Sequence, residues 1–462
     1  MALGRCHMVS AVRAGLSRLP FVVLLVLAIM ALSFVFMMLC RYEQNRRNAG
    51  GAGSPQSSAV AYGEELPATG RFTKIITYTC IDAPGRETVS PVVWDDGWFF
   101  GDMRAYNHDL ARASSVLAAL AYSESSHYQE SYQTPPYMEN ALAELGFDEV
   151  STASYEYRSE VMDQMLNLVT QREDTVAYTL ARKRVTGADG STRSVILVSV
   201  RGSYGSEWLS NLKIEGVSPE GETALSEDQE ARYDHSGYVE AASEVSQAVA
   251  PWVRESHRRG DQVTLLLVGH SRGGAIANLV AAQADDELAA LAEGAQPQDG
   301  LGLAAGDAVA GYTFASPGCT TSAHAHAARY GNIFNIANPA DLMPALPLAS
   351  WGYARYGVDM NLPAMGEEGF DIQFASMSSA YTELTGEEDP YDPETAQAVR
   401  SVVSEVGAEV GSVDELVTPG GIAAVAQACA RHIDPTRILC GHYPSVYISW
   451  MYTIEADDLT LR

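Results

Sequence analysis

The chain has 462 residues, enough for one large α/β domain with additions or for two to three small domains. Hydrophobic residues make up 47% and charged residues 19% of it, which is typical of a globular protein and not of a disordered one. Acidic residues outnumber basic ones 58 to 30, giving a net charge of −28 without a basic stripe, which argues against a nucleic-acid-binding protein.

The N-terminal segment predicts a membrane anchor. A basic flank at residues 1–19 precedes Phe21–Leu39, an apolar run relieved only by a serine. A span of about 20 residues can cross a bilayer, whereas a signal-peptide core has about 7–15, so we expect an uncleaved transmembrane signal anchor at 20–40. A cleaved signal peptide is the alternative, because small residues follow at Ala49–Ala61. Three arginines flank each side, so charge does not choose an orientation.

We expect a large C-terminal domain to be translocated, which gives a single-pass membrane protein with an extracytoplasmic domain, or a secreted one after cleavage. Residues 41–70, rich in Gly, Ala, Ser and Pro, predict a flexible linker before a folded domain at 71–462. The first 47 residues carry six arginines against one glutamate, so the rest of the chain carries −33.

Four cysteines lie beyond the linker: Cys80, Cys319, Cys429 and Cys440. Cys429 and Cys440 could pair in an oxidising compartment, but four cysteines allow three connectivities and spacing decides none. No pair has the spacing of a zinc site, so neither a metal nor another cofactor is expected.

Helical and extended patterns alternate along the folded part. We expect helices at Leu110–Tyr122, Glu139–Leu145, Gly237–Glu255 and from Gly273 onward, and strands at Thr175–Leu180, Ser194–Val200, Val263–Val268, Ala308–Phe314 and Asn332–Ile336. The strands at 194–200 and 263–268 are apolar almost throughout, as buried strands of a parallel sheet are. The order predicts an α/β fold whose mostly parallel central sheet is covered on both faces.

The residues after the strand at 263–268 carry the chemistry. They are Gly269-His270-Ser271-Arg272-Gly273-Gly274, a G-x-S-x-G motif between an apolar strand and an Ala-rich helix. A nucleophilic serine at such a turn needs glycines two before and two after it, so that the crossing chains can touch. The helix N-terminus also favours negative charge beside Ser271. The alternative is a glycine-rich turn with an incidental serine; His270 is expected to point away from the site.

A serine nucleophile needs a base, an acid and an oxyanion hole, and in this architecture acid and base follow the serine in that order. Asp341 lies on a proline-rich loop after a predicted strand, where such an acid belongs. Two histidines follow it: His432 ends a helical stretch, where it could complement the helix dipole, and His442 lies in a loop. We therefore prefer His442 as the base and keep His432 as the alternative.

The oxyanion hole needs two donors. One is the backbone N–H of Arg272, the residue after the nucleophile. The other is expected from the loop after the strand at 194–200, where Ser203 can offer its N–H and its hydroxyl. An ordinary strand-end turn is the alternative interpretation of Arg201-Gly202.

The chain resembles the class 3 (fungal triacylglycerol lipase-like) family of the α/β-hydrolases. The matching motifs are Val200–Ser203 followed by Trp208 and Leu209, His235–Tyr238, Gly269–Gly274, Thr313–Gly318, Asn335–Pro347, and His442 with Tyr443. They cover roughly residues 170–350 and a short C-terminal piece. The resemblance implies a Ser271–Asp341–His442 triad, an oxyanion hole of Ser203 and the Arg272 amide, and a lid around Trp208.

Two departures from the family stand out. Arg272 occupies a position that is usually uncharged in the family. His442 follows Asp341 by 101 positions, and this long interval predicts a helical insertion at about 365–435 near the mouth of the site, where it would shape the acyl pocket. Asp392-Pro393 and Ser412–Glu415 look like helix starts within it.

These features predict a membrane-anchored serine ester hydrolase of α/β-hydrolase fold that acts on the acyl esters of lipids through an acyl-enzyme. A small-ester esterase or an acyltransferase with the same triad is an alternative. An inactive, membrane-tethered binding domain is a third, but nothing structural requires Ser, Asp and His together.

Overall fold

The structure is a computed structural model that describes residues 68–129, 133–155, 176–203, 236–295, 300–412, 415, 418–433, 437 and 439–461. The chain divides into two units, Met1–Glu65 and Leu66–Arg462, and every described residue belongs to the second. The predicted anchor at 20–40 and almost all of the linker at 41–70 therefore lie outside the described residues. No helix within the described ranges combines the length and the apolarity that crossing a membrane requires.

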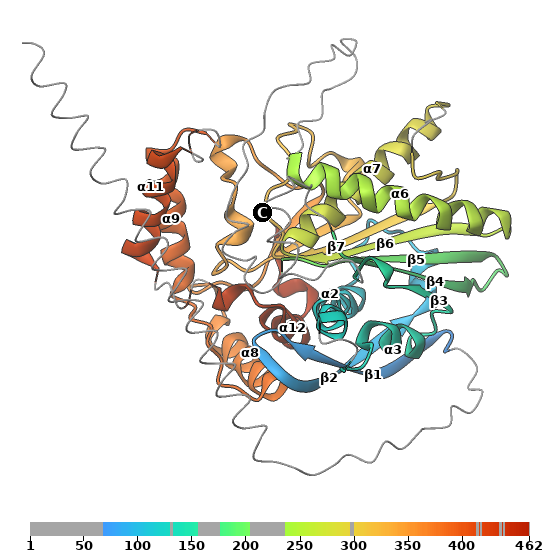
Figure 1. Ribbon diagram of the computed structural model, residues 1–462, viewed down its shortest axis with the longest axis horizontal. Helices are drawn as coiled ribbons and strands as arrows, with labels where there is room; N and C mark the ends of the chain where they lie inside the picture. Colours follow the sequence, from blue (N-terminus) through green and yellow to red (C-terminus); the bar gives the residue numbers. More distant parts are fainter. Residues whose placement is uncertain are drawn as a thin grey trace, which may run out of the picture. The chain divides into compact units, whose positions relative to one another are not determined.

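An eight-stranded sheet forms the centre of this unit (Figure 1). Its strands are β3 (Glu149–Ser151), β4 (Tyr178–Thr186), β5 (Thr192–Val200), β6 (Gln262–His270), β7 (Ala308–Phe314), β8 (Ile333–Ala337), β9 (Val358–Asn361) and β10 (Thr460–Leu461). They lie in the order β10-β9-β8-β7-β6-β5-β4-β3. The pairs from β5 to β9 are parallel, and the outer pairs β3–β4, β4–β5 and β9–β10 are antiparallel. The expected mostly parallel central sheet is confirmed.

Both faces of the sheet are covered, which explains why its central strands are apolar throughout. On β5, Ile196 and Val198 pack with helices α6 (Ser236–Arg258) and α7 (Arg272–Ala292). The alternate residues Val195 and Leu197 face the other way, toward α2 (His108–Gln129), α3 (Tyr137–Glu144) and α12 (Pro444–Thr453). Figure 1 shows α6 and α7 on one side of the sheet and α2, α3 and α12 on the other.

The folded unit begins with a hairpin that the sequence analysis did not predict. Strands β1 (Arg71–Cys80) and β2 (Ala83–Asp95) pair antiparallel in a separate two-stranded sheet. Alternate residues of β1 are buried, namely Ile76, Tyr78 and Cys80, while the residues between them face outward. The alternation is blurred in the sequence, because Ile75 and Val89 face outward while Thr88 and Ser90 are buried.

Helices α8 (Phe370–Thr385), α9 (Thr395–Glu409) and α11 (Pro419–His432) occupy the segment of the expected insertion at 365–435. Helices α9 and α11 pack against each other and against the loop after β8. Their aliphatic residues form one cluster with leucines of that loop: Leu342, Leu346, Leu348, Val399, Val402, Val406 and Ala428. The insertion thus packs directly on the loop that carries Asp341.

At the first expected start, Asp392 Oδ1 accepts the N–H of Glu394 at 3.0 Å, as a capping side chain does. Regular α9 begins two residues after Pro393, at Thr395. At the second expected start, Ser412 Oγ accepts the N–H of Glu415 at 3.2 Å, as a capping residue does. The two residues between them lie outside the described residues.

No disulfide joins any two of the four cysteines of the folded unit, so the bridge considered between Cys429 and Cys440 is not formed. Cys80, Cys319 and Cys440 are buried. Burial raises the pKa of the Cys80 thiol well above its ordinary value and also raises that of Cys429. Both groups are therefore expected to remain thiols at neutral pH.

Helix α7 buries a carboxyl group away from its N-terminus. Asp285 is 7% exposed, and both of its carboxylate oxygens accept from Asn332 Nδ2, at 3.0 and 3.1 Å. Burial raises the pKa of Asp285 to about 8, although the Asn332 hydrogen bond opposes this. The unfolded chain releases this proton near pH 4, so between about pH 4 and 8 the folded state binds a proton that the unfolded state has lost.

We expect the melting temperature of Asp285→Asn to exceed that of the parent protein by an amount that grows with pH. The parent loses stability as pH rises toward 8, whereas the amide of the variant does not titrate. The difference should be smallest near pH 5 and largest near pH 8.5, as measured by thermal denaturation in matched buffers. A difference that does not change with pH would show that Asp285 does not titrate in this range.

Candidate active site

The turn between β6 and α7 holds Ser271 in a strained conformation. Ser271 has φ 57° and ψ −133°, and it shares a positive φ with one other non-glycine residue of the described part, Ala315. Such a backbone costs of the order of 1–3 kcal/mol and persists where the surroundings enforce it. Ser271 is 3% exposed, and its N–H donates to the carbonyl of Phe314 at the end of β7 at 2.9 Å.

The glycines on either side of Ser271 are required by close approach of backbone. A Cβ on Gly269 would lie 2.3 Å from the carbonyl oxygen of Gly273. A Cβ on Gly273 would lie 2.2 Å from the carbonyl oxygen of Val200, at the end of β5. The crossing chains therefore touch at these two positions, as the motif predicts.

The strand end after β5 reaches the same turn. A Cβ on Gly202 would lie 3.1 Å from Cβ of Ser271 and 2.5 Å from the carbonyl oxygen of His270. The next residue, Ser203, is 5% exposed. Arg272 is the first residue of α7. The structure thus brings the two predicted oxyanion-hole segments to the nucleophile from neighbouring parallel strands.

Asp341 and His442 form a fully buried pair. Oδ2 of Asp341 lies 2.6 Å from Nδ1 of His442, and neither side chain is exposed. A carboxylate only accepts, so Nδ1 of His442 carries the proton in this contact. With Nδ1 occupied in this contact, Nε2 is the ring nitrogen that can take a proton from a nucleophile.

Tyr447 is a site residue that the sequence analysis missed. It lies on α12, one turn beyond His442, and its hydroxyl donates to Oδ2 of Asp341 at 2.9 Å. Burial first, and then the Asp341 charge, raise the pKa of Tyr447 well above its ordinary value, so the hydroxyl remains a donor. The backbone N–H of Met343 donates to the other oxygen, Oδ1, at 2.9 Å.

Asn338 ties the acid loop to the base, and the sequence analysis missed it too. Its Nδ2 donates to the carbonyl of Gly441 at 2.9 Å, directly before His442. Its backbone N–H donates to Tyr447 Oη at 3.0 Å, and its Oδ1 accepts from Tyr391 Oη of the insertion at 3.1 Å. A tyrosine five residues after a histidine and an asparagine three before an aspartate were weak signals in the sequence.

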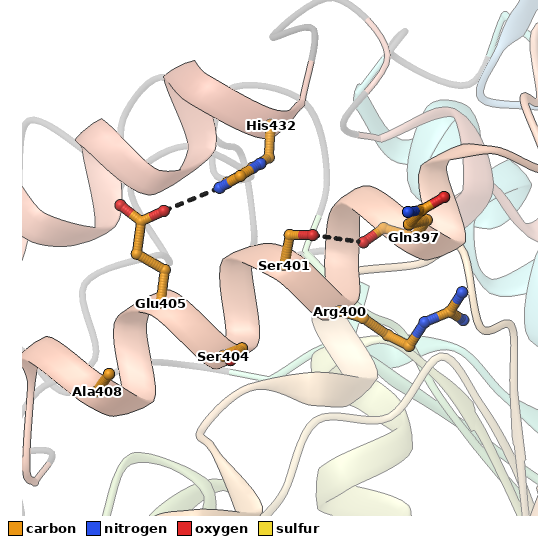
Figure 2. A pocket seen from close by; sticks show the side chains of 7 residues that line it. All are labelled: Gln397, Arg400, Ser401, Ser404, Glu405, Ala408 and His432. Carbon is orange, nitrogen blue, oxygen red and sulfur yellow. Dashed lines mark hydrogen bonds and ion pairs between the residues drawn. The ribbon is translucent and has the colours of Figure 1, made fainter.

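His432, the alternative base, lies elsewhere. It ends α11, and its Nε2 lies 2.8 Å from Oε2 of Glu405 on α9. Figure 2 shows the two side chains bridging these helices at an open pocket, whose other lining residues are Gln397, Arg400, Ser401, Ser404 and Ala408. The structure brings His442 to Asp341, and it pairs His432 with a different carboxylate.

Trp208, the predicted lid residue, lies outside the described residues, as do residues 204–235 around it. Within the described ranges, no group of histidine, cysteine, aspartate and glutamate side chains is arranged to hold a metal ion. The three predicted triad residues lie in loops or turns: Ser271 directly after β6, Asp341 in the loop after β8, and His442 directly before α12.

The close approach at Gly273 gives a stability test with a matched control. Gly273→Ala should destabilise the fold by about 1–3 kcal/mol, because its Cβ would overlap the β5 backbone. Gly420 is likewise the second residue of a helix, α11, but a Cβ there meets no atom closer than 3.7 Å. Gly420→Ala should leave stability unchanged or improve it by up to about 1 kcal/mol. Urea denaturation of both variants measures this, and equal effects would contradict the packing account.

Comparison with known proteins agrees with the resemblance of the sequence. Residues 197–351 match the family model "Lipase (class 3)", a range that runs from the second half of β5 through the loop after Asp341. No curated protein sequence matches the chain. The family match confirms the predicted resemblance to class 3 lipases and, with it, a carboxylic ester hydrolase.

Solved structures of fungal lipases also align with the chain. The native Rhizomucor miehei lipase propeptide complex is 19% identical, covers 56% of this chain and 70% of its own, and gives a TM-score of 0.36. The lipase from Rhizopus microsporus var. chinensis is 15% identical, with coverages of 67% and 84% and a TM-score of 0.34. Lipase II from Rhizopus niveus is 15% identical, with coverages of 55% and 80% and a TM-score of 0.34.

Proposed function

We propose that this class 3 lipase-like ester hydrolase cleaves the acyl esters of lipids with Ser271 as nucleophile, His442 as base and Asp341 as the acid that orients it. The observation that carries the proposal is the buried contact of 2.6 Å between Asp341 Oδ2 and His442 Nδ1. It uses Nδ1 of the imidazole, so the other ring nitrogen, Nε2, is the one that can accept a proton. The strained turn that presents Ser271 supports the same role.

The proposed reaction has two halves. Ser271 Oγ attacks the ester carbonyl carbon while His442 Nε2 takes the hydroxyl proton, and Asp341 stabilises the imidazolium that forms. The tetrahedral intermediate expels the alcohol, which takes the proton back from His442, and an acyl-enzyme remains. Water then attacks the acyl carbon with His442 again as base, and the acid and free Ser271 are released.

The negative charge of the tetrahedral intermediate needs fixed donors. We assign these to the backbone N–H of Arg272 and to Ser203, whose segment touches the nucleophile turn through Gly202. Arg272 begins a helix of 21 residues, so the helix dipole adds to its N–H. Trp208 remains the proposed lid residue.

Two features of this chain bear on where and on what the enzyme acts. The insertion packs on the acid loop through Leu342, Leu346 and Leu348, so we propose that it shapes the acyl-binding side of the site. We also propose that the apolar segment at 20–40 anchors the chain in a membrane, with the hydrolase domain on the extracytoplasmic side. The anchor would keep the domain close to its substrate even at an anionic lipid surface, which repels the domain because of its negative charge.

The triad makes a prediction about three alanine variants. Ser271→Ala, Asp341→Ala and His442→Ala should each lower kcat by about a thousandfold or more, and the losses should not add, because one removal already disables proton transfer. Labelling with a fluorophosphonate probe and hydrolysis of an ester series of increasing acyl length measure this. A wild-type protein that neither labels nor hydrolyses any ester would refute the proposed function.

His432→Ala is the matched control for the base. Like His442, His432 contacts a carboxylate, but that carboxylate belongs to Glu405 and not to Asp341. The variant should therefore leave kcat within about threefold and lower the free energy of unfolding by about 1 kcal/mol or less. Both histidine variants are checked for folding by circular dichroism. A folded His442→Ala protein that keeps its activity, beside an inactive His432→Ala protein, would move the base to His432.

The anchor makes a separate prediction. A chain that begins at Asn48 should be soluble without detergent and retain kcat on a dispersed ester, because it keeps all of the described residues, whose first strand starts at Arg71. Its activity on lipid vesicles should be lower than that of the full chain, since it lacks the proposed anchor. Sedimentation, and activity with and without detergent, measure this. Aggregation of the shortened chain would show that the apolar run belongs to the folded domain.

A further inference from the structure

The residue before the nucleophile contacts the base. His270 is 1% exposed, and its Nε2 lies 2.8 Å from the backbone carbonyl oxygen of His442. Its Nδ1 lies 2.9 Å from the hydroxyl oxygen of Tyr122 on α2. The rings of His270 and His442 are 4.8 Å apart. His270 was expected to point away from the site; it points into the core, where it meets the backbone of the base.

These partners define the protonation of His270. A carbonyl oxygen only accepts, so Nε2 carries a proton and donates it to His442. Burial, followed by the neighbouring His442, lowers the pKa of His270 well below its ordinary value, so the ring stays neutral. Nδ1 is then the acceptor, and Tyr122 Oη donates to it. Neutrality also matters because His442 itself becomes positive during the reaction.

The two carbonyl groups that flank the base are thus held by two buried side chains. Asn338, from the acid loop, donates to the carbonyl of Gly441 at 2.9 Å. His270, from the nucleophile turn, donates to the carbonyl of His442. Because the backbone of His442 is fixed on both sides, the ring can reach Asp341 only over a narrow range of side-chain torsions.

We propose that His270 is a positioning residue, whose Nε2–H holds the backbone of His442 at the distance from Ser271 that proton transfer needs. One peptide bond joins His270 to Ser271, so the contact ties the base directly to the backbone that presents the nucleophile. Tyr122 orients the ring from α2. The inference rests on the proposed function, since it assigns His270 a role in that triad.

The chain contains a second histidine with the same contacts at a remote place. His108 Nδ1 lies 3.0 Å from Tyr106 Oη, and its Nε2 lies 2.9 Å from the carbonyl oxygen of Ile454. Ile454 follows the last residue of α12, whereas His442 precedes the first. The helix has ten residues and so separates the two carbonyls by about 15 Å. His108→Phe therefore removes the same hydrogen bonds without touching the triad.

His270→Phe keeps a buried ring and removes the donor. We expect kcat on a soluble ester to fall by about 10- to 100-fold, because a small displacement of a catalytic group costs this much. KM should stay within about threefold, and fluorophosphonate labelling of Ser271 should slow in parallel with kcat. His270→Gln, whose Nε2 can still donate to the carbonyl, should recover kcat to within about fivefold of wild type. His108→Phe should lower thermal stability but leave kcat within about threefold.

Three outcomes would overturn the proposal: kcat of His270→Phe no lower than that of His108→Phe, no recovery in His270→Gln, or a change confined to KM. If His270→Phe fails to fold, His270→Asn replaces it, because its shorter amide does not reach the carbonyl, and the comparison with His270→Gln decides. A wild-type protein that does not react with the probe would refute the triad itself, and a reactive wild type with an equally reactive His270→Phe would refute only the role of His270.

Discussion

The buried contact between Asp341 and His442 is the constraint on which the site depends. An ionic hydrogen bond of 2.6 Å without solvent exposure requires that both groups be satisfied and fixed, since an unpaired buried charge is costly. The structure meets this requirement with neutral donors. The Tyr447 hydroxyl and the Met343 amide donate hydrogen bonds to the two oxygens of the carboxylate. Asn338 and His270 donate to the backbone carbonyls at the base.

The packing around this contact explains why the insertion belongs to the site. Helices α9 and α11 bury their aliphatic faces on Leu342, the neighbour of Asp341 in the chain. Arg355, 5% exposed, donates from Nη1 to the carbonyls of Ser316 and Pro344, and so joins the loop after β7 to the acid loop. Asp359 balances the charge of Arg355 at 2.8 Å. The acid loop is thus held from the sheet side and from the insertion side together.

The sequence predicted those features that follow from local pattern. The apolar strand before Gly269 and the turn at Ser271 could be inferred because strand burial and glycine spacing are local properties. The hairpin β1–β2 could not, since its apolar and polar residues do not alternate cleanly: Val89 faces outward between the buried Thr88 and Ser90. Only packing against α2 shows which face is buried. The contacts of Tyr447, Asn338 and His270 could not be predicted for a related reason. Each residue hydrogen-bonds to a partner about a hundred positions or more away, and no local sequence pattern identifies such a partner.

The chain length between acid and base has an evolutionary consequence. Asp341 and His442 are separated by 101 positions, yet the contact between them is short and fully enclosed. The entropy lost on closing a flexible loop grows only with the logarithm of its length, so doubling such a segment costs only about 0.6 kcal/mol more. An insertion there is inexpensive in stability as long as it packs on the acid loop. This interval is therefore a place where new sequence can be accommodated and pocket shape can diverge while the proton-transfer geometry is conserved.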